Sequence, residues 1–225
     1  MAISEDVIEK IKAMIISGEI RPGERLPREP DLAERLGVGR NTLREAVRAL
    51  IAMQILVIKR GDGTYVSSLE PHLLLENLAF AADVSSGRTA QQLLQVRRLL
   101  EPQATALAAS LVTDGDLRTL QKILDRCGAA TNPEEFVAHD SEFHRTIADI
   151  VGNPVLSTLL STLSTHTQRV RVLRGAKATD ALSTAHREHQ AILRALAARD
   201  PQLAASTSAV HIAAVEQWVQ DASED

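Results

Sequence analysis

The chain has 225 residues, which suits one large domain or two small ones, and its hydrophobic content of 44% excludes wholesale disorder. A single cysteine, Cys127, excludes an intramolecular disulfide and a zinc cluster built on thiolates. The net charge of −4 argues at first against a nucleic-acid partner, but residues 35–60 carry six Lys and Arg side chains against one acid, Glu45. A basic segment of this kind is the electrostatic footprint that DNA requires, whatever the total for the chain.

The first residues, MAISEDVIEKIKAMI, predict an amphipathic helix with acids in its first turn, and Gly18 is placed to end it. They lack the basic start and the long apolar stretch of a signal peptide. No run approaches the about 18 uninterrupted apolar residues of a membrane span. We therefore expect a cytoplasmic protein without a membrane segment.

The segment EPDLAERLGVGRNTLREAVRAL has the spacing of a helix–turn–helix. Leu32 and Leu36 would face inward from the first helix, Gly37 supplies a left-handed turn residue, and the second helix has its own apolar stripe. The opposite face of the second helix presents Arg40, Asn41, Arg44 and Arg48. Arginine and asparagine can bond guanine and adenine edges in the major groove, so this face predicts DNA reading.

Two short β-strands are predicted in ILVIKRGDGTYVSS, around a turn at residues 60–63 in which Asp62-Gly63 is a strong hairpin signal. Such a hairpin would be a wing that lies along the DNA backbone or in the minor groove. An arginine-rich helix alone is as often a solvated surface as a DNA contact. The helix–turn–helix spacing, the basic run and the hairpin together favour DNA binding.

Helical periodicity continues nearly throughout the chain after Ser68. Breaks near residues 87, 113–115, 131–133, 152–154, 175 and 200–201 predict six or seven helices, which we expect to pack as an antiparallel bundle. The fold class is therefore mainly α. Residues 1–68 would form a winged helix-turn-helix DNA-binding domain, and residues 69–225 a helical effector-binding and dimerisation domain.

Residues 5–68, with IISGEIRPGERLP, LAERLGVGRNTLREAVRAL and GDGTYV, resemble the winged-helix domain of GntR-type transcriptional regulators. The resemblance implies that Arg40 and Arg44 are the principal DNA contacts. It implies that the assisting residues are Arg28, Asn41, Gly61 and Gly63. Two positions depart from the family pattern, because Gly39 stands where a serine often caps the recognition helix and Pro30 where some members have an arginine.

Asp140 and His144 are four positions apart in DSEFHRTIADI, so both project from one face of a helix. His189 and His211 lie on two later helices, each with an apolar stripe that points toward the core. Polar groups on the core side are costly unless they are paired or bind a metal, and one carboxylate with three imidazoles suits a divalent first-row ion. His139 and His186 are offset from these positions and should point elsewhere, and His166 is a candidate neighbour of the ligands.

The helical part also resembles the FCD domain of FadR-type regulators, through VRRLLEPQATALAA at residues 96–109 and through the later Asp and His pattern. The metal-containing subset of these domains implies that Asp140, His144, His189 and His211 bind a metal ion. Zn²⁺ is the favoured ion, with Ni²⁺ and Mn²⁺ as alternatives.

Arg97 matches an arginine that commonly faces the effector cavity in that family, where it would bind a small carboxylate effector through two hydrogen bonds. An ion pair with Glu101, four residues later, is an equally good interpretation. Arg169 and Arg171 are further anion-binding candidates, with little in the sequence to separate them.

These features predict a homodimeric, ligand-responsive regulator that reads a pseudo-palindromic double-stranded DNA operator and senses a small organic acid. Repression relieved by the ligand is the more common behaviour in the family. The first alternative is a metal-dependent hydrolase fused to a DNA-binding module, against which stand the missing HExxH motif and the lack of a placed general base. The second is an FCD regulator without metal.

Overall fold

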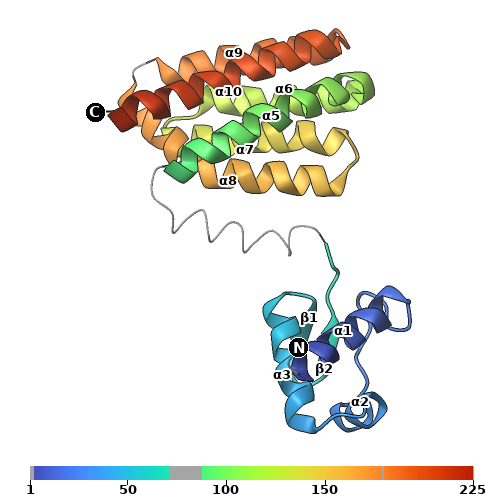
Figure 1. Cartoon of the computed structure of the whole chain (residues 1–225). Coiled ribbons are helices and arrows are strands. Elements are labelled where there is room, and N and C mark those ends of the chain that lie inside the picture. Colours follow the sequence, from blue (N-terminus) through green and yellow to red (C-terminus); the bar gives the residue numbers. More distant parts are fainter. Residues whose placement is uncertain (1–2, 71–87, 179, 225) are drawn as a thin grey trace. The chain divides into compact units, whose positions relative to one another are not determined.

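The computed structural model describes residues 3–70, 88–178 and 180–224, and the chain divides into two compact units, Met1–Leu74 and Leu75–Asp225 (Figure 1). The predicted domain boundary at residue 68 stays a prediction, because residues 71–87 lie outside the described part. The predicted helix break near Gly87 falls outside it as well.

The first unit contains three helices and a two-stranded sheet in its described residues: α1 (Ile3–Ile16), α2 (Glu29–Leu36), α3 (Arg40–Ala52), β1 (Leu56–Lys59) and β2 (Gly63–Val66). Its core contains Leu32, Leu43, Val47 and Leu50, as the apolar spacing predicts. Gly37 ends α2 with φ of +67°, a left-handed conformation that favours glycine. α2 and α3 thus form the predicted helix–turn–helix.

The wing is an antiparallel hairpin in which Leu56 pairs with Val66 and Lys59 pairs with Gly63. Its turn occupies residues 60–62, where Gly61 has φ of +76°. Leu56 and Val66 point into the core of the unit, so the hairpin is fixed at its base while its tip is exposed.

Six helices form the described part of the second unit: α5 (Arg88–Leu111), α6 (Asp114–Ala129), α7 (Pro133–Ile150), α8 (Pro154–Lys177), α9 (Ala181–Ala197) and α10 (Pro201–Glu224). They pack side by side as a bundle (Figure 1). Leu, Ile, Val and Ala side chains dominate the core, and Phe136 and Phe143 are its two buried phenylalanines. The predicted mainly helical fold with a winged helix-turn-helix is confirmed.

The predicted break at Gly175 is misplaced, because α8 continues through this residue to Lys177. A Cβ atom at Gly175 would lie 2.7 Å from Leu182 of α9 and 3.1 Å from Pro133 of α7. The glycine therefore permits close packing of three helices here rather than ending one.

No helix in the described residues combines the length and the apolar character that crossing a membrane requires.

Candidate functional site

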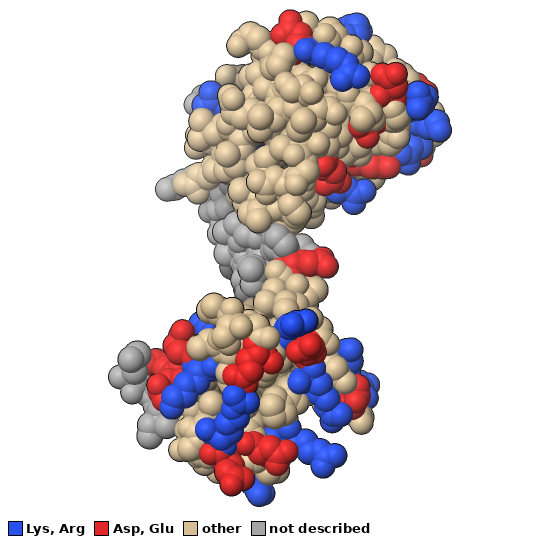
Figure 2. Space-filling model, turned by 90° about the vertical axis from the view of Figure 1, so that its right-hand side faces the viewer, with Lys and Arg blue, Asp and Glu red and all other residues tan. Residues whose placement is uncertain are grey.

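The recognition helix α3 presents a polar, positively charged face. Arg40, Asn41, Arg44 and Arg48 are exposed, while the buried residues of α3 are Leu43, Ala46, Val47 and Leu50. Gly39 precedes the helix, and no side chain caps the first turn there. Lys and Arg side chains are interspersed with Asp and Glu over the surface of this unit (Figure 2). The arrangement can bind phosphates and base edges.

Arg44 is held by an acid from the neighbouring helix. Its Nε atom donates to Glu29 Oε2 over 2.8 Å, which leaves the two terminal nitrogen atoms of the guanidinium for another acceptor. Arg28, directly before α2, is exposed and makes no capping hydrogen bond. The helix–turn–helix thus brings Arg28, Glu29 and Arg44 to adjoining parts of α2 and α3.

Glycine suits the two wing positions, 61 and 63, for different structural reasons. Gly61 takes its positive φ in the turn, whereas Gly63 has φ of +147° and lies against the side chain of Arg25. A Cβ atom at Gly63 would lie 2.7 Å from Arg25 Nε. Arg25 also forms an ion pair with Asp62 at 3.5 Å. Because Gly63 has no side chain, the Arg25 guanidinium can lie against the wing at this position.

A buried polar centre lies inside the helical unit. Asp140 and His144 of α7, His189 of α9 and His211 of α10 each offer one ligand atom, and these four atoms lie within 4.8 Å of one another. The Nε2 atom of His211 is 3.2 Å from that of His144 and 3.2 Å from that of His189. Asp140 Oδ1 lies 3.1 Å from His189 Nε2 and 3.8 Å from His144 Nε2.

Two glutamates orient the imidazoles of this centre. Glu101 Oε2 lies 3.3 Å from His144 Nδ1, and Glu188 Oε2 lies 2.9 Å from His211 Nδ1. A carboxylate at Nδ1 places the ring proton there and leaves Nε2 as a lone pair that faces the centre. Burial lowers the pKa of His144 and of His189 to about 3, so both rings are neutral at neutral pH.

These residues fit a divalent metal ion. With protons on both Nδ1 atoms, His144 and His211 face each other with two acceptor nitrogens at 3.2 Å, an arrangement that is repulsive without a positive charge between them. Neutral imidazoles and a carboxylate are also the donor types that first-row ions prefer. The donor set therefore supports a metal site, and nothing in it selects one ion.

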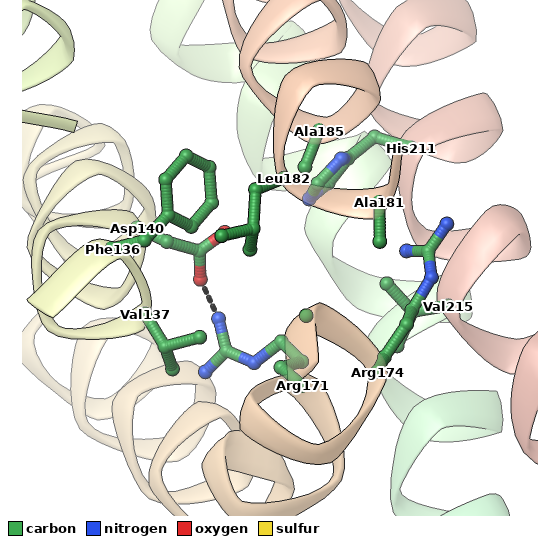
Figure 3. Close-up of a pocket in the computed structure, with 11 residues that line it drawn as sticks. Phe136, Val137, Asp140, Arg171, Arg174, Ala181, Leu182, Ala185, His211 and Val215 are labelled. Atoms are coloured by element: carbon green, nitrogen blue, oxygen red, sulfur yellow. Dashed lines mark ion pairs between the residues drawn. The ribbon is translucent and has the colours of Figure 1, made fainter. Parts of the chain in front are cut away.

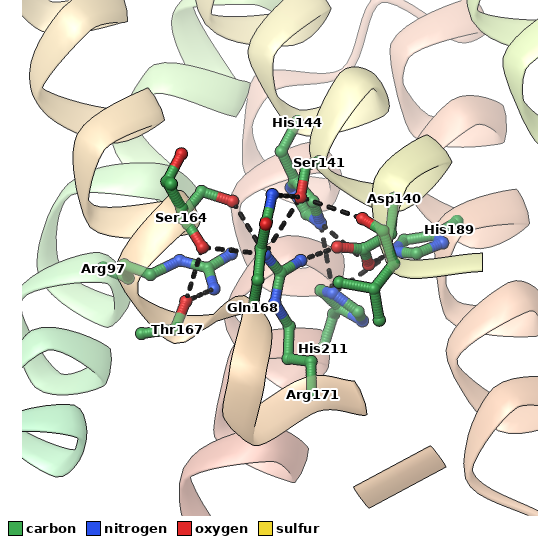
Figure 4. Close-up of polar contacts among 12 residues, drawn as sticks. Arg97, Asp140, Ser141, His144, Ser164, Thr167, Gln168, Arg171, His189 and His211 are labelled. Atoms are coloured by element: carbon green, nitrogen blue, oxygen red, sulfur yellow. Dashed lines mark hydrogen bonds and ion pairs between the residues drawn. The ribbon is translucent and has the colours of Figure 1, made fainter. Parts of the chain in front are cut away.

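Two buried arginines adjoin the centre (Figure 4). Arg97 donates from Nε to Glu101 Oε1 over 2.5 Å and from Nη1 to Thr167 Oγ1 over 2.8 Å, so the i+4 ion pair is present. Arg171 forms an ion pair with Asp140, marked by the dashed line in Figure 3. Arg97 and Arg171 carry the positive charge closest to the proposed ligands.

Other candidate residues lie apart from the centre. His139 is 3.7 Å from Glu142, and His186 Nε2 is 3.0 Å from Gln190 Nε2, so neither ring belongs to the group of four. Arg169 is exposed on α8. The side chain of His166, the predicted neighbour of the ligands, lies outside the described part of the structure.

Comparison with known proteins identifies both units. The family model described as "Bacterial regulatory proteins, gntR family" matches residues 3–66, and the model described as "FCD domain" matches residues 92–214. The chain belongs to the GntR family. It is a DNA-binding transcriptional regulator with an FCD domain, as the sequence resemblance predicted.

Relatives of this GntR regulator are similar over nearly the whole chain. HTH-type transcriptional regulator LutR of Bacillus subtilis (strain 168) is 32% identical over 90% of this chain and 94% of its own length. HTH-type transcriptional repressor NanR of Cronobacter sakazakii is 31% identical over 95% and 84%. The solved structure of Streptococcus agalactiae GntR superposes with a TM-score of 0.69 at 31% identity, over 96% of this chain and 99% of that one. LutR and NanR are named as transcriptional regulators, which together with the GntR-family match confirms the regulator interpretation over the hydrolase.

Three residues of this GntR regulator's sites were missed or left undecided by sequence reasoning. Glu188 adjoins His189 in sequence, but its carboxylate orients His211 on another helix. Glu29 precedes the helix–turn–helix and reaches Arg44, 15 residues later. The sequence alone did not show which of Arg169 and Arg171 lies at the site. Arg171 follows Ser164 by seven residues, about two helical turns, so the two side chains share a face of α8, and this spacing could have favoured Arg171.

Proposed function

We propose that this chain is a homodimeric repressor that binds a divalent metal ion and a small carboxylate effector in its FCD domain. Arg40, Asn41, Arg44 and Arg48 would read a pseudo-palindromic operator, assisted by Arg28 and the wing around Gly61 and Gly63. The observation that carries the proposed metal and effector site is the convergence of one carboxylate and three imidazoles in the buried centre, where burial lowers the pKa of all three rings and so keeps them neutral.

The proposed ligands are Asp140, His144, His189 and His211, with Zn²⁺ favoured over Ni²⁺ and Mn²⁺. When bound, the ion supplies a Lewis-acidic centre at which a carboxylate oxygen can complete the coordination shell. Glu101 and Glu188 hold the imidazole rings, and Arg97 neutralises the charge of Glu101. Ligand binding would favour one of two states of the regulator and so change operator affinity.

Two observations support dimerisation through α5 and α10. Members of this family typically dimerise. The two helices also expose apolar side chains, namely Val96, Leu99, Leu107 and Leu111 on α5 and Leu203 and Val210 on α10. Apolar side chains that gather on an exposed surface are typical of a contact between proteins.

Metal analysis of the purified protein tests the proposed metal site. After reconstitution with Zn²⁺, elemental mass spectrometry should find one ion per chain in the wild type and none in the double variant His189→Ala/His211→Ala. The matched control is His139→Ala/His186→Ala, which removes two imidazoles outside the centre and should keep the ion. A wild-type protein that holds no metal would support the metal-free alternative.

Operator binding measured with and without an acid tests whether the proposed effector site controls DNA affinity. Fluorescence anisotropy with operator DNA should show an affinity that changes when a carboxylic acid is added to the Zn²⁺-loaded wild type. The His189→Ala/His211→Ala variant should bind the operator without responding to the acid. A response that survives in this variant would contradict sensing at the metal centre.

A further inference from the structure

Arg171 and Asp140 form an ion pair inside the helical unit (Figure 3). Their side chains are only 5% and 3% exposed, so water compensates neither charge. Burial lowers the pKa of the Arg171 guanidinium, but an arginine stays protonated in proteins, and its charge therefore needs a nearby anion. Asp140 supplies that anion.

The two carboxylate oxygens of Asp140 face different partners. Oδ1 lies 3.1 Å from His189 Nε2 and 3.8 Å from His144 Nε2. Oδ2 pairs with Nη1 of Arg171. The two sets of contacts do not exclude each other, so an ion bound among the imidazoles would share Asp140 with Arg171.

Hydrogen bonds hold the other terminal nitrogen of Arg171 (Figure 4). Nη2 donates to the backbone carbonyl of Ser164 over 2.9 Å, to Ser164 Oγ over 3.0 Å and to Ser141 Oγ over 3.1 Å. Ser141 belongs to α7 and Ser164 to α8, so both helices position the guanidinium. Arg171 is therefore a fixed charge beside the proposed ligands.

The almost fully buried charges of the centre balance one another without a metal ion. Burial lowers the pKa of its three imidazoles, which are therefore neutral at neutral pH. The described ionised side chains that are almost fully buried beside them are two pairs, Arg97 with Glu101 and Arg171 with Asp140. Glu188, which also contacts the centre, is partly exposed to water. A divalent ion would therefore add positive charge that neither pair compensates.

A fixed cation at this place opposes the binding of a second one. Charges of the same sign repel strongly in a buried site, because little water screens them. Arg171 also neutralises Asp140, which is the one carboxylate among the four proposed ligands. Without Arg171, the metal-free protein would contain Asp140 as a buried charge that has lost its counter-ion, which is strongly destabilising.

We propose that Arg171 is the counter-ion of Asp140 in the metal-free protein and that it limits the affinity of the centre for a divalent ion. The inference rests on the proposed metal site and adds a residue that regulates it. The fold then does not depend on the ion. Metal occupancy follows the concentration of the free ion instead.

Competition with a chromophoric chelator measures the Zn²⁺ affinity of the full-length protein. Arg171→Met removes the charge and keeps an unbranched side chain, so it should bind Zn²⁺ at least about tenfold more tightly than the wild type. Arg171→Lys keeps a positive charge and should stay within about threefold of the wild type. Arg169→Met removes an exposed arginine of the same helix and should leave the affinity unchanged.

Thermal unfolding in EDTA tests the counter-ion without any metal. Arg171→Met should lower Tm, and Arg171→Met/Asp140→Asn, which removes both charges, should regain most of this loss. Saturating Zn²⁺ should raise the Tm of Arg171→Met by more than that of the wild type, because the tighter complex is stabilised more. A double variant as unstable as Arg171→Met would mean that Arg171 contributes packing rather than charge, and would overturn its role as counter-ion.

Weaker Zn²⁺ binding by Arg171→Met than by the wild type would overturn the limit on affinity, since Arg171 would then strengthen binding by orienting Asp140. Equal changes in Arg171→Met and Arg171→Lys would overturn it as well, because the charge would have no effect. Absence of Zn²⁺ binding by the wild type and Arg171→Met alike would overturn the proposed metal site and the limit on affinity with it. The comparison in EDTA does not depend on that site.

Discussion

Glu29 and Arg44 form an ion pair whose effect is on orientation more than on stability. Both side chains are about half exposed, and exposed pairs contribute little to the free energy of unfolding. The pair engages the Nε side of the guanidinium at 2.8 Å and leaves the two terminal nitrogens in the geometry that a guanine edge accepts. An acid on α2 thereby pre-orients an arginine of α3 that is proposed to read bases.

Replacing this arginine should weaken operator binding without affecting folding. Arg44→Ala is expected to cost about 1–3 kcal/mol of specific binding free energy, the range for one lost bidentate base contact. Fluorescence anisotropy measures the affinity, and thermal unfolding checks the fold. Arg35→Ala is the control, because Arg35 is also a surface arginine paired with an acid, Glu19, but lies on α2. An equal loss in both variants would mean that Arg44 contributes only net charge.

Helices and turns are predicted well from the sequence where one short stretch of residues contains the whole pattern. The apolar stripe of α3 and the Asp62-Gly63 turn are local patterns, and both elements form where they are expected. The four proposed metal ligands could be grouped because each shares a face with core residues. Glu188 and Arg171 could not be assigned, since their partners His211 and Asp140 lie on other helices. Which residues meet depends on how α9 crosses α10 and how α8 crosses α7, which helical periodicity does not determine.

A capping box fixes the start of α6. Thr113 Oγ1 accepts from the Asp116 backbone N–H over 3.2 Å, and the Asp116 carboxylate accepts from the Thr113 N–H over 2.9 Å. Thr113→Ala should lower the free energy of unfolding by about 1 kcal/mol. Urea unfolding at neutral pH measures this loss, with Thr119→Ala, at an exposed residue inside the same helix, as the control. Equal destabilisation by both variants would contradict the role of the cap.

The same cap predicts a pH dependence. Hydrogen bonds from the Thr113 side chain and backbone hold the pKa of Asp116 below its ordinary value. The stabilisation is therefore present above the ordinary aspartate pKa and is lost as pH falls through the lower pKa of the folded state. The difference between wild type and Thr113→Ala should shrink at acid pH, and a difference that grows there would contradict this account.

At the scale of the whole molecule, the exposed apolar face of α5 and α10 predicts the oligomeric state. A charge in its middle, as in Leu107→Glu, should convert a dimer into a monomer of about 24.4 kDa and weaken binding to a palindromic operator. Sedimentation equilibrium measures the mass. Val155→Glu places the same charge at an exposed apolar residue of α8 and should remain dimeric. A dimeric Leu107→Glu protein would place the contact elsewhere.

α5 has two faces with different chemical roles. Its buried face carries Arg97 and Glu101, and Glu101 contacts His144 at 3.3 Å. Its exposed face carries Leu99 and Leu107, where a second subunit would pack. α5 is also the first described helix that follows the winged-helix unit along the chain. In the proposed regulator, α5 would thus link the carboxylate that holds His144 to the surface where a second subunit packs, so a change at the metal centre and a change at the dimer contact would both act on the same helix.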